Sequence, residues 1–435
     1  MKFNYKQTML VGLAFLTISA FWQLYDFTIP LILKNTFKIN DAIAGFIMSF
    51  DNIIALFLLP LFGTLSDKTQ TKIGRRTPYI IAGTIASVIF MMIIPYAAHK
   101  QNLAVFITSL FFVLISMAVY RSPSVALMPD VTPKPLRSKG NAVINLMGTI
   151  GGALFLMLNS FLAPDTRNPE TANYWPIFIS TAVIMLAGTL VLILTVNEPK
   201  MSEKMRQESA AMGIDPEDEN VSAEPAYVKE KLQKDVRKSM FFILISVSLW
   251  YMGYNAITSA FSKYAINALG MKESMASLIL VVSVITATAA FIPIGITSSK
   301  IGRKKSILYG VVLLTAAFAV TSLYRSYSPL FFVIFAVAGI AWACINVNSL
   351  PMVLEISKSG NVGKYTGYYY TFSMAAQVIT PILSGIMLER FGYFTLFPYG
   401  SVFIGLAFFT MLMVKHGDSK PPVPVSKLEV FNAAD

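Results

Sequence analysis

The feature that most constrains this chain is the alternation of long apolar runs with short charged segments. The runs are roughly 20 residues long, the length that a helix needs to cross the hydrocarbon core of a bilayer. Apolar residues make up 55% of the chain and charged residues 13%, whereas a soluble domain contains about 25% charged residues. The sequence therefore predicts an all-α membrane protein.

The apolar runs predict twelve transmembrane helices in two pseudo-symmetric halves of six helices each. Helices are expected near residues 9–33, 42–65, 78–97, 103–129, 138–162 and 174–196, and again near 239–267, 273–297, 306–324, 329–353, 363–389 and 393–415. The halves then comprise residues 1–196 and 239–415. Residues 197–238 are expected to form a solvated cytoplasmic linker whose end can lie on the inner leaflet, and residues 416–435 a disordered cytoplasmic tail.

The basic residues follow the predicted loops. The net charge is +12, and of the 35 Lys and Arg residues about 26 lie on the side of the two termini and about 7 on the opposite side. This bias places both termini in the cytoplasm of a multi-pass protein of the cell membrane. It also accounts for the positive charge without a nucleic-acid partner. Lys263, near the outer end of its helix, is expected to snorkel toward the surface.

Signals for enzyme or metal chemistry are missing. Cys344 is the only cysteine, and His99 and His416 lie in or beside loops, so neither a disulfide nor a metal site is expected. No phosphate-binding Gly-Lys-Ser/Thr loop follows a strand, and no Ser/His/Asp arrangement is visible. The first apolar run is too long for a cleaved signal peptide and is expected to remain as a helix. The sequence therefore predicts no enzyme and no cofactor.

An internal repeat supports the division into halves. The loop after the second helix reads Gly63-Thr-Leu-Ser66-Asp67-Lys68 and then Gly74-Arg75-Arg76. The loop after the eighth helix has Gly295, Ser299-Lys300 and Gly302-Arg303-Lys304-Lys305 at the equivalent place. In the first loop Asp67 can pair with an arginine or with the N-terminus of a nearby helix, and such pairs can break and re-form between two states. Alternatively, the charges only fix the topology. Ser299 stands where the second half would have the acid.

The Gly63–Arg76 loop resembles the signature between helices 2 and 3 of the major facilitator superfamily. The longer string from Ser66 to Pro78 is similar to the plant sucrose carriers, the solute carrier family 45 sugar transporters and the glycoside–pentoside–hexuronide:cation symporters. Two further stretches agree: Pro123-Ser-Val-Ala-Leu-Met-Pro-Asp130 followed by Arg137 and Asn141, and Gly363-Lys-Tyr-Thr-Gly367-Tyr-Tyr-Tyr leading to Gln377 and Pro381. The resemblance implies two parallel six-helix halves with a substrate site between them near the midplane.

Two acids at membrane depth are candidates for cation coupling, because charges there are costly and are usually functional. Asp26 in helix 1 and Asp51 in helix 2 should both lie roughly 10 Å below the outer surface, from the rise per residue. Two carboxyls at one depth can share a proton or a sodium ion. The alternative is that each only binds a neighbouring helix or caps its own. The family resemblance implies cation coupling, and fewer helix acids than in melibiose-type carriers favour protons.

Arg121 lies inside the fourth helix and needs a buried partner or must snorkel. Asp26, Asp51 and Glu355 are its candidate partners. Asp130 and Glu355 end helices 4 and 10 at equivalent positions. We expect them to act as gating acids that face Arg75 and Arg76 in the first half and Arg303 and Lys304 in the second.

A sugar site needs aromatic faces together with amides and acids that bind hydroxyls. Such residues recur at midplane depth: Trp22, Gln23 and Tyr25 in helix 1; Asn52 in helix 2; Asn145 in helix 5; Tyr251, Tyr254 and Asn255 in helix 7; Trp342, Asn346 and Asn348 in helix 10; and Tyr369, Tyr370 and Gln377 in helix 11. Any one aromatic can instead face lipid, and any amide can join two helices.

The sequence thus predicts a monomeric carrier, surrounded by membrane lipid, that imports a small neutral glycoside by proton symport. An α-glucoside disaccharide such as sucrose or maltose is the expected substrate. The rival prediction is a proton-coupled exporter of hydrophobic drugs or metabolites, which the many membrane amides disfavour. A sensor without transport activity has no support, because no additional cytoplasmic domain is expected.

Overall fold

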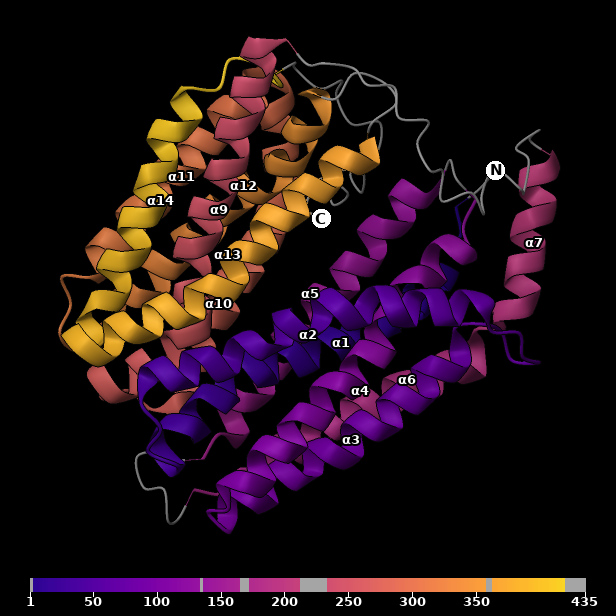
Figure 1. The fold of residues 1–435 in the computed structure, drawn as a ribbon, viewed down its shortest axis with the longest axis horizontal. Coiled ribbons are helices and arrows are strands. Elements are labelled where there is room, and N and C mark those ends of the chain that lie inside the picture. Colours follow the sequence, from indigo (N-terminus) through magenta and orange to yellow (C-terminus); the bar gives the residue numbers. More distant parts are fainter. Residues whose placement is uncertain (1–2, 134–135, 165–171, 212–232, 357–361, 419–435) are drawn as a thin grey trace. The chain divides into compact units, whose positions relative to one another are not determined.

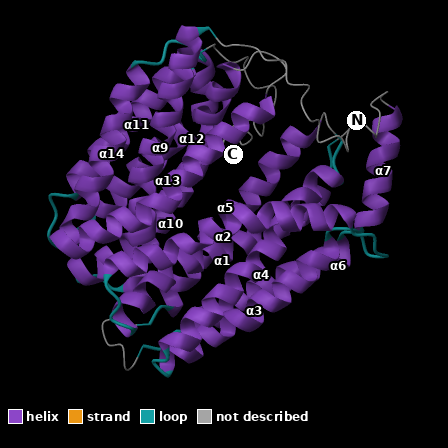
Figure 2. Cartoon of the chain, in the orientation of Figure 1, coloured by secondary structure: helices purple, strands orange, loops and turns teal. Residues whose placement is uncertain are grey.

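The computed structural model describes residues 3–133, 136–164, 172–211, 233–356 and 362–418. Within these ranges the chain is helical with short loops and contains no strand (Figure 2). Twelve helices of the described part of the chain are long and apolar enough to span a membrane, which confirms the predicted fold class. A further helix, α7, is too polar to do so.

The helices of the first part of the chain are α1 (Tyr5–Leu31), α2 (Asp41–Lys68), α3 (Thr77–His99), α4 (Leu103–Asp130), α5 (Arg137–Leu162), α6 (Trp175–Thr195) and α7 (Glu198–Ala211). Those of the second part are α9 (Lys234–Lys263), α10 (Glu273–Ile301), α11 (Arg303–Thr321), α12 (Leu330–Ile356), α13 (Val362–Phe391) and α14 (Leu396–Leu412). Figure 1 shows their order along the chain. Wider π-helical turns extend α1 and α9, at Ile32–Thr36 and Tyr264–Ala268.

The chain divides into two compact units that do not coincide with the predicted halves. Unit 1 comprises residues 1–38 and 50–222, and unit 2 comprises residues 39–49 and 223–435. The first turns of α2 therefore pack with the second part of the chain, and the rest of α2 packs with the first. In unit 1, α1 lies against α5 and α6, and α3 lies against α4. In unit 2, α9 lies against α13 and α14, and α12 lies against α10 and α11.

Small residues allow the helix backbones to approach closely, as is usual in membranes. A Cβ atom on Gly151 of α5 would lie 2.0 Å from the backbone oxygen of Leu16 in α1. A Cβ atom on Gly339 of α12 would lie 2.3 Å from the backbone oxygen of Ser283 in α10. Any larger residue at either position would force the two helices of that unit apart.

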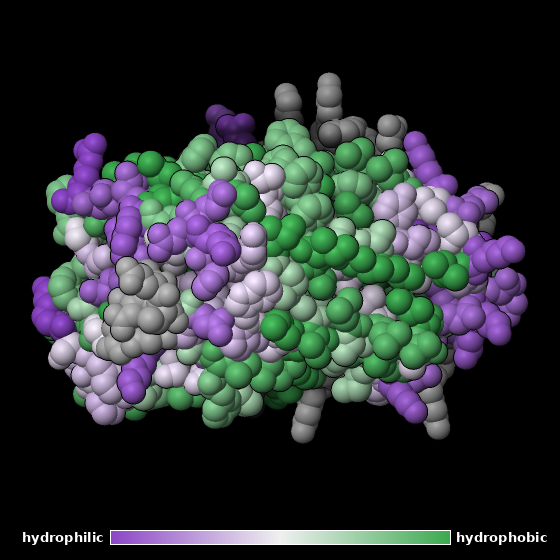
Figure 3. All heavy atoms as spheres, turned by 90° about the horizontal axis from the view of Figure 1, so that it is seen from below, coloured by the Kyte–Doolittle hydropathy of each residue, from purple (hydrophilic) through white to green (hydrophobic). Residues whose placement is uncertain are grey.

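The surface of the molecule is widely apolar. Large side chains such as Phe57, Phe161 and Leu194 are 69%, 80% and 74% exposed, which would be unfavourable in water but suits lipid. Figure 3 shows one face, on which hydrophobic residues form broad continuous areas. Together with the twelve spanning helices, this surface identifies a multi-pass membrane protein.

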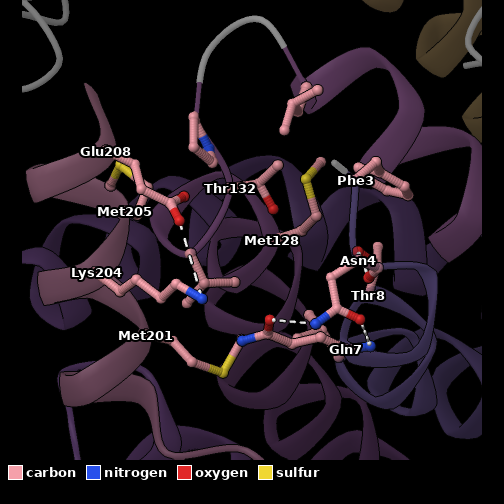
Figure 4. Close-up of a pocket in the computed structure, with 14 residues that line it drawn as sticks. Phe3, Asn4, Gln7, Thr8, Met128, Thr132, Met201, Lys204, Met205 and Glu208 are labelled. Atoms are coloured by element: carbon pink, nitrogen blue, oxygen red, sulfur yellow. Dashed lines mark hydrogen bonds and ion pairs between the residues drawn. The ribbon is translucent and has the colours of Figure 1, made fainter. Parts of the chain in front are cut away.

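Helix α7 was not predicted, because its sequence reads as a charged linker. Met205 and Ser209 are nevertheless buried. They lie one turn apart, on the face of α7 that packs on the rest of unit 1. Beside α7 is a hollow with Met201, Lys204 and Met205 on one side, and Gln7 of α1 and its N-cap residue Asn4 on another (Figure 4). Residues 198–211 of the expected linker therefore form a helix that belongs to unit 1.

Candidate functional site

The ionisable residues predicted at membrane depth gather in unit 1. Asp26 on α1, Asp51 on α2 and Arg121 on α4 are partly buried. The charge of Asp51 acts on both Asp26 and Arg121, so the three groups form one electrostatic cluster. Glu355, the other candidate partner of Arg121, is engaged elsewhere, with Arg303 in unit 2.

Aromatic and amide side chains surround this cluster. The guanidinium carbon of Arg121 lies 5.7 Å from the centroid of the Trp22 ring, within the range of a cation–π contact. Trp22 meets Tyr25 edge-on, with 5.5 Å between ring centroids. The side-chain amide of Asn52 donates a hydrogen bond of 2.8 Å to Asp51 Oδ1. Three of the predicted site residues on α1 and α2, Trp22, Tyr25 and Asn52, therefore lie beside the coupling candidates.

Several buried donors of unit 1 have no acceptor within the described residues. Among them are the indole nitrogen of Trp22 and the amide nitrogen of Asn145 on α5. A buried donor without an acceptor costs about 1–3 kcal/mol, so both are suited to a ligand or water oxygen. Gln23 faces α5 as well, since its Oε1 would lie 3.6 Å from a Cβ atom on Gly152. The polar faces of α1 and α5 thus meet here.

Unit 2 presents an aromatic wall, which we define as Tyr251, Tyr254, Trp342, Tyr369 and Tyr370. Tyr254 on α9 stacks on Trp342 of α12 with 3.7 Å between centroids and 5° between planes. Tyr251 meets the same indole edge-on at 5.5 Å, and its hydroxyl is hydrogen-bonded to that of Tyr369 on α13. Tyr369 packs edge-on against Tyr370. None of these five side chains carries a formal charge at neutral pH.

The amides predicted near this wall differ in availability. The buried amide nitrogen of Asn255, next to Tyr254 on α9, has no acceptor within the described residues. Asn348, in contrast, donates to the backbone oxygen of Cys344 at 2.9 Å and is 2% exposed. Its side-chain amide is therefore already hydrogen-bonded within its own helix. Asn346 follows Trp342 by one turn, and Gln377 follows Tyr370 by two. Both are half-buried and share helix faces with the wall.

The predicted gating residues of the first half form a network at one end of unit 1. Arg75 donates two hydrogen bonds to the Asp130 carboxylate, at 2.7 and 3.1 Å. Arg76 donates to Asp130 at 2.7 Å and also bonds Asp67 and Ser66. Burial disfavours the charge of Arg76, but Asp130 and Asp67 outweigh this effect and raise the pKa of its guanidinium. The Arg76 guanidinium therefore keeps its charge at the centre of this network.

Glu198, at the start of α7, completes this network and was missed from the sequence. Its carboxylate accepts hydrogen bonds from the backbone nitrogens of Arg75, Arg76 and Thr77, at 2.8–2.9 Å. It thereby caps the N-terminus of α3, where the helix dipole favours a negative charge. The only signal in the sequence was its position directly after the sixth span.

Unit 2 repeats this plan, with fewer contacts recorded among its described residues. Arg303 pairs with Glu355, and the backbone nitrogen of Lys304 donates to Asp418 at 2.8 Å. Asp418 follows the last span as Glu198 follows the sixth. Gly74 and Gly302, at the equivalent loop positions, have φ angles of 115° and 98°, which glycine adopts most readily. Ser299 bonds the backbone of its own helix and takes no part.

Lys263 was predicted to snorkel toward the surface, but its side chain is buried. It is 4% exposed, and its ammonium donates to Asp41 Oδ1 at 2.8 Å. The hydroxyl of Tyr393 donates to Asp41 Oδ2 at 3.1 Å, and the backbone nitrogen of Asp41 donates to Glu389 at 2.8 Å. A buried acid on the first turn of α2 holds the lysine inside unit 2. We call these four residues the Asp41 cluster.

Comparisons with known proteins agree with this architecture. The model of the Major Facilitator Superfamily matches residues 11–272 and 243–432. The chain therefore belongs to the Major Facilitator Superfamily, as its loop signatures predicted.

Curated relatives resemble parts of the chain. Sucrose transport protein SUC3 of Arabidopsis thaliana is 28% identical over 36% of this chain and 31% of that protein. SUC4 of the same plant is 25% identical over 33% of each chain. Alpha-ketoglutarate permease of Escherichia coli is 25% identical over 41% of this chain and 39% of that protein. The matches span about two fifths of the relatives' length or less.

Solved structures share the fold over nearly the whole chain. The inward-open xylose transporter XylE from E. coli superposes with a TM-score of 0.69 and 15% identity, covering 97% of this chain and 98% of that one. The nucleoside transporter NupG superposes with a TM-score of 0.68 and 17% identity, covering 95% and 100%. These neighbours support the fold, whereas the substrate has to be argued from the residues.

Proposed function

We propose that this protein imports a small neutral glycoside, with an α-glucoside disaccharide such as sucrose or maltose as the best candidate. Proton symport and alternating access would drive the uptake. The observation that carries the proposal is the cluster of Asp26, Asp51 and Arg121 beside Trp22. A carboxyl that can bind and release a proton lies there next to an aromatic face and an unpaired indole donor.

Polar and aromatic groups within each of the two units favour a substrate with many hydroxyls. The unpaired donors of Trp22, Asn145 and Asn255 can each bind a hydroxyl oxygen, and the stacked Tyr254 and Trp342 rings offer an apolar face to the C–H bonds of a sugar ring. A hydrophobic drug would leave such donors unsatisfied. The named activity of SUC3 and SUC4 supports the same substrate class.

The acids favour a proton as the coupling ion. A carboxyl at membrane depth can be neutral in one state and charged in the other, so that Arg121 can exchange partners as the proton leaves. Sodium is the alternative ion. Within the described residues, no group of three or more His, Cys, Asp or Glu side chains could hold a metal ion. We also propose a monomer in the cell membrane with both termini in the cytoplasm, as the distribution of Lys and Arg favours.

Uptake into proteoliposomes tests this proposal. The purified protein should accumulate labelled sucrose or maltose when the outside is acidic, and a protonophore should abolish the accumulation. Accumulation driven by a sodium gradient alone would show that sodium, and not the proton, is the coupling ion. Export of an apolar dye with no sugar uptake would establish the rival function.

A further inference from the structure

We propose that unit 2 binds an anionic phospholipid in a groove along α10, α11 and α12. The groove has a volume of about 490 Å³, within the roughly 300–1,000 Å³ of ligand-binding cavities. Its walls include Ala289, Pro293 and Thr297 of α10, Tyr309 of α11 and Ile340 of α12. All five are exposed and lie within membrane-spanning helices, so the groove opens on the lipid-facing surface.

The lining suits an acyl chain and not a sugar. Its Ser and Thr hydroxyl groups are already used, because Thr286 donates to Val282 and Ser283, Thr297 donates to Pro293, and Ser306 donates to Gly302, in each case to a backbone oxygen three or four residues earlier. What remains toward the groove is mainly hydrocarbon. From Thr286 to Ile301 the α10 wall is roughly 22 Å long by the rise per residue. That length is enough for an acyl chain to reach through one leaflet, about half of the 30 Å hydrocarbon core.

Two lysines stand at the end of the groove. Lys300 follows Thr297 by one turn of α10, and Lys305 precedes Tyr309 by one turn of α11, so each shares a helix face with a lining residue. Both are exposed, and within the described residues neither takes part in an ion pair. Their neighbours are engaged: Arg303 pairs with Glu355, and the Lys304 ammonium donates to the backbone oxygen of Val414 at 2.5 Å.

The combination selects one occupant. The ammonium groups of the two lysines attract a negatively charged headgroup, and the apolar part of the groove accepts the acyl chain. Tyr309, one turn from Lys305, is suited to the boundary between headgroup and acyl chain, because its ring is apolar and its hydroxyl is polar. The proposed orientation places this end at the cytoplasmic leaflet, which holds the anionic lipids. A zwitterionic lipid would gain the apolar contacts but little from the lysines.

Native mass spectrometry of the purified full chain tests the site, with phosphatidylglycerol and phosphatidylcholine of identical acyl chains as probes. The wild type should retain phosphatidylglycerol preferentially. Replacing both lysines, Lys300→Gln with Lys305→Gln, should reduce that preference roughly thirtyfold, since each cation near the surface contributes about 1 kcal/mol. Lys272→Gln, which removes an exposed lysine just before the other end of α10, should leave it unchanged.

The groove itself is tested by filling it. Ala289→Trp should displace the retained phosphatidylglycerol, whereas Ile285→Trp, on the same helix but outside the lining, should not. Cys344 also lines the groove and is the only cysteine, so phosphatidylglycerol should slow its alkylation by N-ethylmaleimide more than phosphatidylcholine does. An unchanged lipid preference in the double lysine variant would overturn the proposal. Equal protection of Cys344 by both lipids, or by glycerol phosphate alone, would do the same.

Discussion

In unit 1, ionisable side chains lie inside the membrane-spanning helices, whereas the equivalent region of unit 2 presents aromatic rings without a formal charge. Asp26, Asp51 and Arg121 form the first group, and the wall around Trp342 forms the second. Since the two parts repeat one helix plan, the difference indicates that they have taken separate tasks. We infer that unit 1 carries the coupling ion and that unit 2 contributes mainly apolar contact to the substrate.

The largest expected effect separates these tasks in unit 1. Asp26→Asn mimics a permanently protonated carboxyl, so it should abolish uphill, pH-driven uptake while sugar binding and exchange of internal for external sugar persist. Asp51→Asn should be milder if Asp51 only tunes its neighbour. Accumulation assays in vesicles with imposed pH and sodium gradients measure both. Wild-type accumulation by Asp26→Asn would show that the proton binds elsewhere.

The matching change in unit 2 should have the opposite signature. Trp342→Ala removes the ring on which Tyr254 stacks and should weaken sugar affinity about tenfold, while uptake at saturating sugar still responds to pH. Trp342→Phe, which keeps an aromatic face, should lose much less. The affinity is read from uptake rates over a range of sugar concentrations. Loss of pH response without loss of affinity would contradict the division of tasks.

The charged network around Glu198 in unit 1 and the one around Asp418 in unit 2 offer a smaller contrast. Glu198→Gln removes the carboxylate charge that accepts hydrogen bonds from three backbone nitrogens at the start of α3. The variant should slow turnover several-fold with nearly unchanged KM. Asp418→Asn removes the equivalent carboxylate at α11, which has fewer contacts, and should slow turnover less. The comparison is made with kcat and KM from the same vesicles. An equal effect of both variants would mean that the richer network of unit 1 has no functional weight.

The smallest effects are expected from single amides. Asn346→Ala and Gln377→Ala should each weaken sugar affinity a few-fold, because each removes one hydroxyl partner, while the protein stays folded in detergent. Asn348→Ala is the control, since that amide bonds its own helix and should leave affinity unchanged. Equilibrium binding of labelled sugar measures all three. Unchanged affinity in the first two variants would remove these amides of α12 and α13 from the site.

The sequence was sufficient for features that depend on local pattern. Runs of hydrophobicity predicted all twelve spanning helices, and the repeated glycine and arginine spacing predicted the equivalent loops around Gly74 and Gly302. Contacts between residues far apart in the chain could not be predicted from the sequence. Nothing near Lys263 pointed to Asp41, and Glu198 looked like a solvated charge because only the fold brings it to the start of α3. Asn348 illustrates a further limit, since an amide inside a helix can bond its own backbone.

The Asp41 cluster also bears on how the chain is made. Asp41 is synthesised with the first helices, but its ammonium partner on Lys263 and the hydroxyl of Tyr393 arrive only with α9 and the segment just before α14. Until then the first turn of α2 carries an acid that cannot be buried without cost, so that turn must wait near water. Biogenesis of this protein therefore should not end with insertion of the separate spans, because α2 can reach its final place only after the last helices have emerged.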